Sequence, residues 1–461
     1  MKYYLTLNKM KLTFFGGAGT VTGSKILLET QYKKILIDCG LFQGLYELRL
    51  KNRTPLPIDL NELDAILLTH AHLDHTGYLP LLVKNGYKQK IYCTRPTKDL
   101  TEIILLDSGK IQEEDARRAN KYNYTRHKPA KPLYDVDDAK NAMLLFETIE
   151  LNKWHSIDDS VKFKFINSGH ILGSAFIVLS INEKIIVFSG DIGRKKPILL
   201  PQYEYIEKAD YVIIESTYGN RLHKNISIRD ELLKYITHTF SKGGILIIPT
   251  FSVERAQEII YLLSILKRKQ QLPNIPIYLD SPMGVNATEV YFNHKKYHNL
   301  TNDDVNSMLS TVQLISNVSA SKAIVNSDNP KIVLAGSGMM TGGRVLHYLD
   351  KCITDKKNSV LIVGYQAEGT RGRALLSGDT EIKFFGNYHK VNAEVFKINA
   401  FSGHADQTEL LDWLQHINPP PKLTFINHGE PHQSQVLKTK IRSDLNWKCT
   451  VAKMNKEYYI E

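Results

Sequence analysis

Residues 69–77 read Thr69-His70-Ala71-His72-Leu73-Asp74-His75-Thr76-Gly77 and place three imidazoles and a carboxylate within six consecutive positions. The apolar run 63–68 before this stretch predicts a buried strand, and the residues from 77 onward begin a helix-like pattern. The four polar side chains are therefore expected in a loop between a strand and a helix. His70 and His72 are two residues apart, so an extended backbone turns both to one side, where they can bind one ion. Asp74 and His75 follow around the bend, placed for a second ion.

Imidazole nitrogens and carboxylate oxygens are the ligands of zinc in catalytic sites, at roughly 2.0 to 2.2 Å, with an open position for water. Two such ions roughly 3.5 to 4 Å apart would hold a hydroxide and a phosphoryl or acyl oxygen together. A polar loop with incidental histidines is the alternative, and a lone His-x-His would favour it. The density of ligands in this stretch instead predicts a hydrolase with two Zn²⁺ per chain.

Further candidate ligands follow other predicted strands. Asp38 ends the strand 34–38 and could orient a ligand histidine, although a turn-forming aspartate before glycine explains it equally well. His170 lies in a predicted loop and could complete a three-histidine site with His70 and His72. Asp191 follows a predicted hairpin and is suited to bridge two ions. A surface turn would explain His170 or Asp191 alone, but together they supply the missing ligands of a two-metal site.

Length and composition predict a globular protein of two domains or three, with 43% hydrophobic and 23% charged residues among 461. No apolar stretch is long enough to span a bilayer, so neither a membrane protein nor a membrane partner is expected. The N-terminus lacks the pattern of a secretory signal, and the four cysteines are widely spaced without a Cys-x-x-Cys pair. A cytoplasmic location is therefore expected. The net charge of +11 is compatible with a polyanionic partner.

From residue 211 onward strands alternate with helices, which predicts an α/β domain with a largely parallel sheet. Within it, the glycine-rich loop 336–344 follows a strand and precedes a helix, an arrangement whose backbone amides can bind an anion. Thr341 stands where the dinucleotide-binding pattern requires its third glycine, so a nucleic-acid phosphate fits better, and a plain tight turn is the alternative. The candidate RNA- or phosphate-binding residues in this loop and in the polar loop 366–373 are Ser337, Gly338, Met340, Thr341, Gly342, Arg344, Arg371 and Arg373.

These residues carry a resemblance to a known family. The sequence resembles the metallo-β-lactamase superfamily and, within it, the β-CASP nucleases, which include ribonuclease J and the endonuclease of the mRNA 3′-end cleavage factor. The four superfamily motifs are matched by Asp38, the stretch from His70 to His75, His170 and Asp191. The three motifs peculiar to β-CASP members are matched by Glu215 in Glu-Ser-Thr-Tyr-Gly, His404 in Phe-Ser-Gly-His-Ala-Asp and His428 in Asn-His-Gly-Glu. The resemblance covers residues 11–455.

The resemblance implies an α/β fold: a four-layer αββα metallo-β-lactamase domain with an inserted α/β β-CASP cap. The expected boundaries are 1–210 and 395–461 for the metallo-β-lactamase domain and 211–394 for the cap. The resemblance further implies which residues bind each of two zinc ions and which residue bridges the ions. His70, His72 and His170 would hold one ion; Asp74, His75 and His428 would hold the other; Asp191 would bridge the two; and Asp38 would orient the ligands.

The same resemblance implies RNA phosphodiester hydrolysis by a hydroxide that the two metals activate, with Asp74 among the catalytic residues. His404 would be the general acid for the leaving oxygen and Glu215 its partner, because a carboxylate favours the protonated imidazole. Family members that act on DNA typically lack a histidine at the position of His428, so single-stranded RNA is the expected partner.

Four questions stay open at this point. The chain could cleave RNA as an endonuclease, as a 5′-to-3′ exonuclease or as both. It could be a catalytically weak RNA-binding scaffold of a processing complex, or a small-molecule metallo-hydrolase. A homodimer is also left open.

Overall fold

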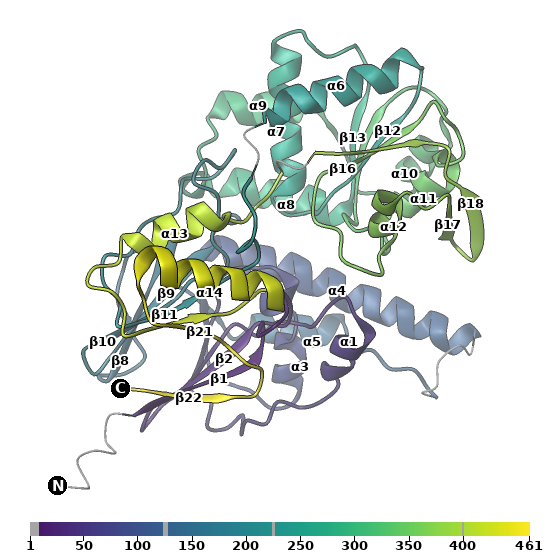
Figure 1. The fold of residues 1–461 in the computed structure, drawn as a ribbon. Helices are drawn as coiled ribbons and strands as arrows, with labels where there is room; N and C mark the ends of the chain where they lie inside the picture. The colour runs from purple at the N-terminus through teal and green to yellow at the C-terminus, as the bar shows by residue number, and fades with distance from the viewer. Residues whose placement is uncertain (1–8, 123–127, 224–225, 399–400) are drawn as a thin grey trace, which may run out of the picture. The chain divides into compact units, whose positions relative to one another are not determined.

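The computed structural model of the chain describes residues 9–122, 128–223, 226–398 and 401–461. The chain divides into two compact units (Figure 1). Unit 1 comprises residues 1–222 and 404–461, and unit 2 comprises residues 223–403. Unit 2 is therefore an insertion in the sequence of unit 1.

Unit 1 contains two seven-stranded sheets. The first has the order β22 (Glu457–Ile460), β1 (Met10–Gly16), β2 (Lys25–Glu29), β3 (Lys34–Ile37), β4 (Ala65–Leu67), β5 (Ile91–Cys93), β6 (Phe146–Thr148). The second has the order β21 (Cys449–Val451), β20 (Leu423–Ile426), β11 (Tyr211–Ile214), β10 (Lys184–Phe188), β9 (Ala175–Ile181), β8 (Val161–Asn167), β7 (His155–Ser156). In both, antiparallel pairs form one side of the sheet and parallel pairs the other.

Alternation along the strands explains how these sheets form layers. Along β3, Ile35 and Ile37 face the core between the two sheets, whereas Leu36 faces the helices outside, as expected for successive strand residues. The first sheet packs against α3 (Leu79–Lys84), α4 (Arg95–Tyr122) and α5 (Val136–Met143), and the second against α13 (Gln407–Gln415) and α14 (Pro431–Leu445) (Figure 1). The short helices α1 (Tyr46–Lys51) and α2 (Leu73–Thr76) complete the unit. The predicted four-layer αββα arrangement is confirmed.

The C-terminal segment completes both sheets of unit 1. β20 pairs in parallel with β11 in the second sheet, and β22 pairs antiparallel with β1 at the edge of the first sheet. The structure places the return to unit 1 at His404, later than the expected residue 395, because β19 (Glu394–Lys397) pairs in parallel with β16 (Ser359–Ile362) in the sheet of unit 2. The domain boundaries themselves stay predictions.

Unit 2 is built on a six-stranded sheet in which every pair is parallel. Its order is β14 (Gln313–Ile315), β13 (Ile277–Asp280), β15 (Ile332–Ala335), β12 (Leu246–Pro249), β16, β19. The helices are α6 (Ile228–Ser241), α7 (Arg255–Arg268), α8 (Pro282–Asn293), α9 (Asn302–Thr311), α10 (Val318–Asn326), α11 (Val345–Cys352), α12 (Arg371–Ser377) and the 3₁₀ turn Lys295–Tyr297; β17 (Glu381–Phe384) and β18 (Asn387–Lys390) form a hairpin. All four residues of β12 are buried, as expected for a strand covered on both faces. The predicted inserted α/β unit is confirmed.

No helix within the described ranges combines the length and the apolar character that crossing a bilayer requires.

Candidate metal centre

Most of the predicted ligands in unit 1 lie just beyond a strand. β4 leads to His70 and His72, and the backbone of His72 is extended, with φ −56° and ψ 148°. Asp74 and His75 lie in the one-turn helix α2 rather than in a loop, because Gly77 N–H already bonds to Leu73 O at 2.8 Å. Three more elements supply the distant residues. His170 follows β8, Asp191 follows β10, and His428 follows β20.

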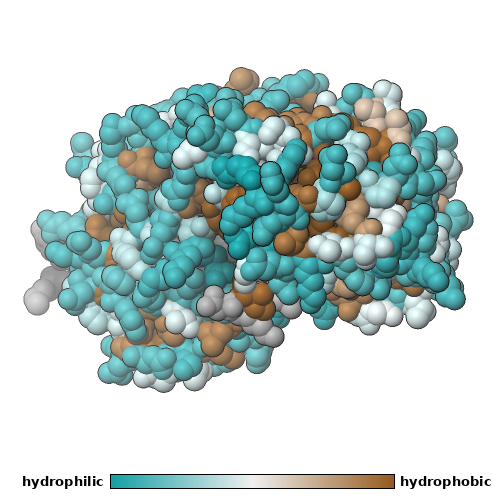
Figure 2. Space-filling model, turned by 90° about the horizontal axis from the view of Figure 1, so that it is seen from above, coloured by the Kyte–Doolittle hydropathy of each residue, from teal (hydrophilic) through white to brown (hydrophobic). Residues whose placement is uncertain are grey.

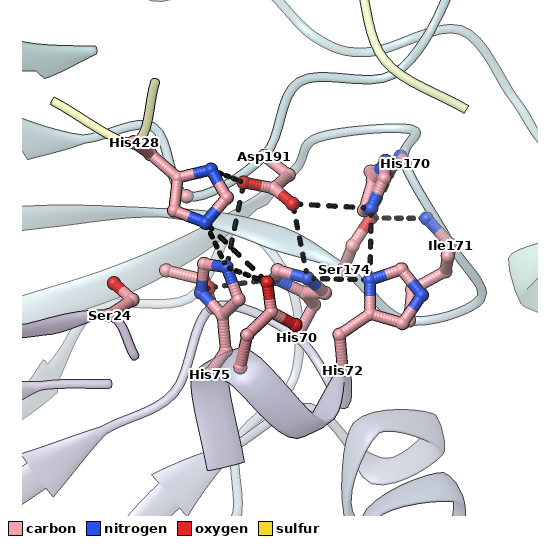
Figure 3. Close-up of polar contacts among 12 residues, drawn as sticks. Ser24, His70, His72, His75, His170, Ile171, Ser174, Asp191 and His428 are labelled. Carbon is pink, nitrogen blue, oxygen red and sulfur yellow. Dashed lines mark hydrogen bonds and ion pairs between the residues drawn. The ribbon is translucent and has the colours of Figure 1, made fainter. Parts of the chain in front are cut away.

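Three imidazoles form the first ligand cluster (Figure 3). His72 Nδ1 lies 3.1 Å from His70 Nε2 and 3.2 Å from His170 Nε2. Asp191 Oδ2 lies 3.5 Å from His70 Nε2 and 3.4 Å from His170 Nε2. Zinc bonds of roughly 2.0 to 2.1 Å in a tetrahedral site place neighbouring ligand atoms about 3.3 Å apart. The four atoms therefore have the spacing of a tetrahedral metal site.

Asp74, His75 and His428 form the second cluster, which is more open. His75 Nε2 and His428 Nε2 are 3.1 Å apart, and Asp74 Oδ2 lies 3.6 Å from His428 Nε2 and 3.9 Å from His75 Nε2. Asp191 Oδ1 faces this cluster, at 3.6 Å from His75 Nε2 and 3.2 Å from His428 Nδ1. The two oxygens of Asp191 thus face two different ligand clusters, as a bridging carboxylate must.

The surroundings of one buried oxygen, Asp191 Oδ1, indicate whether this site fits metal ions. Asp191 Oδ1 is buried and makes no hydrogen bond to any residue that the structure describes. Burying a charged oxygen without a hydrogen bond is costly, and a cation between Asp191 and the second cluster would remove that cost. The donor set and this oxygen both fit divalent cations.

Asp38 contacts the metal-binding stretch 69–77 at Thr69 and at His75. Its carboxylate accepts hydrogen bonds from the backbone N–H of Thr69 at 2.8 Å and from Thr69 Oγ1 at 3.0 Å, and it lies 2.7 Å from His75 Nδ1. Ser24 Oγ donates a longer bond of 3.4 Å. These contacts leave His75 Nε2 pointing at the second cluster, which is how a carboxylate orients a ligand histidine.

Thr69 and Ser174 support the site but had no role in the sequence-based prediction. Thr69 Oγ1 also lies 3.0 Å from His70 Nδ1, so it links Asp38 to the first cluster. Ser174 Oγ accepts the backbone N–H groups of His170 at 3.0 Å and Ile171 at 3.2 Å. The only signal in the sequence was that each is a hydroxyl residue close to a candidate ligand.

Burial and charge set the protonation of the ligands. Burial lowers the pKa of His70 and of His72, and neighbouring imidazoles add to the effect for His70, so both rings are neutral, the form that binds metal. Burial also lowers the pKa of His75, but the charges of Asp191 and Asp38 outweigh it and raise that pKa to about 10. A metal ion bound at His75 must therefore displace a proton.

The buried Glu215 and the partly buried His404 form a pair beside the first cluster. His404 Nδ1 lies 3.2 Å from Glu215 Oε1, and the ring centroids of His404 and His170 are 4.5 Å apart. Burial lowers the pKa of His404, but the charges of Glu215 and Asp191 outweigh it and raise that pKa to about 9. Glu215 Oε1 also accepts the Ile192 N–H at 2.7 Å, which fixes the carboxylate. The carboxylates of Glu215 and Asp191 thus favour the protonated imidazole of His404.

The predicted phosphate-binding residues lie in unit 2, where most of their polar groups bond to other groups of the protein. Ser337 Oγ accepts the N–H groups of Thr341 at 3.0 Å and Gly342 at 3.4 Å. Arg344 pairs with the fully buried Asp280 and donates to the carbonyls of residues 315 and 316. Their anion-binding role stays a prediction that these contacts do not support.

The two arginines of the polar loop differ from each other. Arg371 donates to the carbonyls of Lys383 at 2.7 Å and Met340 at 3.1 Å, so its guanidinium braces the loop. Arg373 is exposed. Gly338 lies against the ring of Phe251.

Comparison with known proteins agrees with this geometry. Family models match three successive parts of the chain: a metallo-beta-lactamase superfamily domain over residues 27–217, a Beta-Casp domain over 256–375, and a Zn-dependent metallo-hydrolase RNA specificity domain over 388–452. The chain is 37% identical to Ribonuclease TTHA0252 of Thermus thermophilus, over 91% of this chain and 93% of that protein. The chain belongs to the β-CASP branch of the metallo-β-lactamase superfamily.

Other relatives of this β-CASP protein carry two further names. It is 36% identical to an RNase J-like protein of Methanocaldococcus jannaschii, over 92% of this chain and 93% of that protein. It is 35% identical to Transcription termination factor FttA of Methanosarcina mazei, over 91% of this chain and 67% of that protein. A crystal structure of a protein of unknown function from Enterococcus faecalis shares the fold, with a TM-score of 0.55 at 12% identity, over 98% of this chain and 100% of that one.

Proposed function

We propose that this protein is a metal-dependent ribonuclease that hydrolyses phosphodiester bonds of single-stranded RNA in RNA processing or decay. The observation that carries the proposal is Asp191, whose two oxygens face two adjoining ligand clusters beside a histidine whose protonated form is favoured. The relatives named as ribonucleases and the match to an RNA specificity domain support RNA as the substrate.

Two Zn²⁺ ions are the metals we propose. The first would be held by His70, His72 and His170, the second by Asp74, His75 and His428, with Asp191 shared between them. When bound, such ions supply Lewis-acid chemistry, polarising a water molecule and neutralising charge on phosphoryl oxygens. The fold implies a divalent metal, whereas zinc and the number of ions are part of this proposal.

The remaining steps fall to residues of the chain. Asp38 and Thr69 hold His75 and His70 in orientation. His404 Nδ1 faces Glu215, so Nε2 is the atom that we assign as proton donor to the leaving oxygen. We also propose a cytoplasmic location, which is supported by four buried cysteines that form no disulfide. A homodimer stays a prediction.

A product-size experiment tests the proposal. A 5′-labelled single-stranded RNA, bearing either a monophosphate or a triphosphate, is incubated with the zinc-loaded protein and resolved on a gel. We expect shorter products that disappear on chelation and return when zinc is added back. Products from internal positions indicate endonuclease action, and loss of the labelled nucleotide first indicates 5′-to-3′ exonuclease action. Turnover of a thioester or lactone with intact RNA would contradict the proposal.

A further inference from the structure

Two exposed aromatic side chains lie at the carboxyl ends of neighbouring strands in unit 2. Phe251 follows β12 and Tyr365 follows β16, and these strands pair in parallel with Leu246 opposite Ser359. Phe251 is 36% exposed and Tyr365 is 43% exposed. Most of the face shown in Figure 2 is hydrophilic, with apolar residues between the polar ones. Exposed apolar groups that adjoin one another can mark a binding site, whereas single ones need no explanation, so the surroundings of these two rings decide what they are.

The ring of Phe251 lies against two glycines. A Cβ atom on Gly338 would lie 2.8 Å from Phe251 Cδ2, and one on Gly364 would lie 2.8 Å from Phe251 Cε2. Neither glycine has a positive φ, so its backbone does not require glycine. At Gly364 a Cβ atom would meet the ring alone, whereas at Gly338 it would also lie 3.0 Å from the backbone N of Phe251. One edge of the ring therefore rests on the backbone of two loops.

Gln366 keeps these loops together. Its side chain is buried, and its Nε2 donates to Gly338 O at 2.9 Å and to Gly364 O at 3.4 Å. The two glycines that border Phe251 are thus joined by one amide. A ring held by fixed backbone on one edge has little freedom to lose when a ligand covers it, which favours binding.

The strand order of the sheet also favours a binding site at the carboxyl ends of β12 and β16. From β12 the chain continues to β13 on one side of it, and from β16 it continues to β19 on the other side. The connections after these two neighbouring strands therefore diverge. Open α/β sheets bind ligands at such points, beyond the carboxyl ends of the strands.

We propose that Phe251, with Tyr365 beside it, is a stacking platform for one base of single-stranded RNA, and this inference rests on the proposed function. Every base has an apolar face that can stack on an aromatic ring, whereas its phosphate needs positive charge nearby. The loop that carries Tyr365 continues to the exposed Arg373, alongside one exposed acid, Glu368. The surplus of 59 basic over 48 acidic residues in the chain also favours a polyanion over an acidic or neutral peptide.

The test compares variants of the full zinc-loaded protein. Phe251→Leu removes the aromatic face and keeps an apolar side chain, and Gly364→Ala displaces the ring without changing it. Phe385→Leu is the matched control, because Phe385 is another exposed phenylalanine of unit 2, on the β17–β18 hairpin. KM and kcat are measured on a short labelled oligouridine and on the same strand with abasic sites. Hydrolysis of bis(p-nitrophenyl) phosphate and the melting temperature are recorded for each protein.

We expect Phe251→Leu to raise KM for oligouridine about tenfold, the scale of one base–aromatic stack, with little change in kcat. Gly364→Ala should raise KM in the same direction, and Phe385→Leu should match the unchanged protein. The abasic strand should bind more weakly to the unchanged protein and should not distinguish it from Phe251→Leu.

Two results would overturn the platform. One is an unchanged KM in both Phe251→Leu and Gly364→Ala; the other is equal KM values for the normal and abasic strands. Either result leaves the proposed function standing if RNA is still cleaved. Hydrolysis of bis(p-nitrophenyl) phosphate without any cleavage of RNA by the unchanged protein overturns the proposed function and the platform together.

Discussion

Replacing Asp38 with asparagine tests the contribution of one negative charge, which lies next to His75 of the second ligand cluster. Asp38 has a φ of 58°, in the left-handed region that asparagine tolerates better than most residues. Asp38→Asn therefore changes the charge and one acceptor oxygen with little change in size or backbone strain. An alanine at this position would add strain and make the result harder to interpret.

The contacts of Asp38 set the expected size of the effect. The carboxylate lies 2.7 Å from His75 Nδ1 and accepts the Thr69 N–H at 2.8 Å, and an asparagine can accept with only one of its two side-chain heteroatoms. A hydrogen bond to a charged group contributes about 1.5 to 3 kcal/mol, or roughly 10- to 150-fold. We expect the site that contains His75 to lose about 10- to 100-fold in metal affinity, and kcat/KM to fall in parallel.

A competition titration with a chromophoric chelator measures the two metal sites of Asp38→Asn. The first cluster, with His70, His72 and His170, should titrate nearly as in the unchanged protein. Asp64→Asn is the matched control, because Asp64 binds Lys33 Nζ at 2.9 Å and Lys34 N–H at 2.8 Å in the same unit. Two sites of unchanged affinity in Asp38→Asn, with unchanged kcat/KM, would refute this account of the carboxylate.

Two further predictions concern pH dependence and the glycine-rich loop. The pKa of His404 is raised to about 9, so its acid form is present below that pH and is lost as the pH rises through it. Glu215→Gln removes a charge that raises this pKa and should move the alkaline limb of the kcat–pH profile to lower pH; an unmoved limb would argue against the pair. Arg344→Met leaves the buried Asp280 without its cationic partner and should lower the free energy of unfolding by about 3 to 5 kcal/mol in a denaturant titration. If Arg344→Met instead raises KM for RNA and leaves the stability unchanged, Arg344 binds phosphate as the sequence predicted.

Local spacing made much of the site predictable. His70, His72, Asp74 and His75 are close in sequence, so their closeness in space follows from the strand and the turn after it. The strands themselves follow from apolar runs, such as the one that became β4. The positions of His70, His170, Asp191 and His428 just beyond strands were therefore predictable without any tertiary information.

Long-range pairing decided the rest, and the sequence carries no direct record of it. Which oxygen of Asp191 faces which cluster depends on the register of β10 against β11 and of β11 against β20. Arg344 looked available for phosphate because its partner, Asp280, ends a strand far away in sequence. Local patterns could not show that this aspartate is buried beside the loop.

The most direct measurement is the rate at which the protein cleaves single-stranded RNA with and without the first ligand cluster intact. Under saturating zinc, the unchanged protein is compared with His72→Ala and with His416→Ala, an exposed histidine of unit 1 that stacks on Tyr205. The proposed metal-dependent cleavage predicts that the unchanged protein and His416→Ala cut the RNA and that His72→Ala does not. Intact RNA with the unchanged protein, under zinc and other divalent metals, or equal cleavage by His72→Ala, would contradict it.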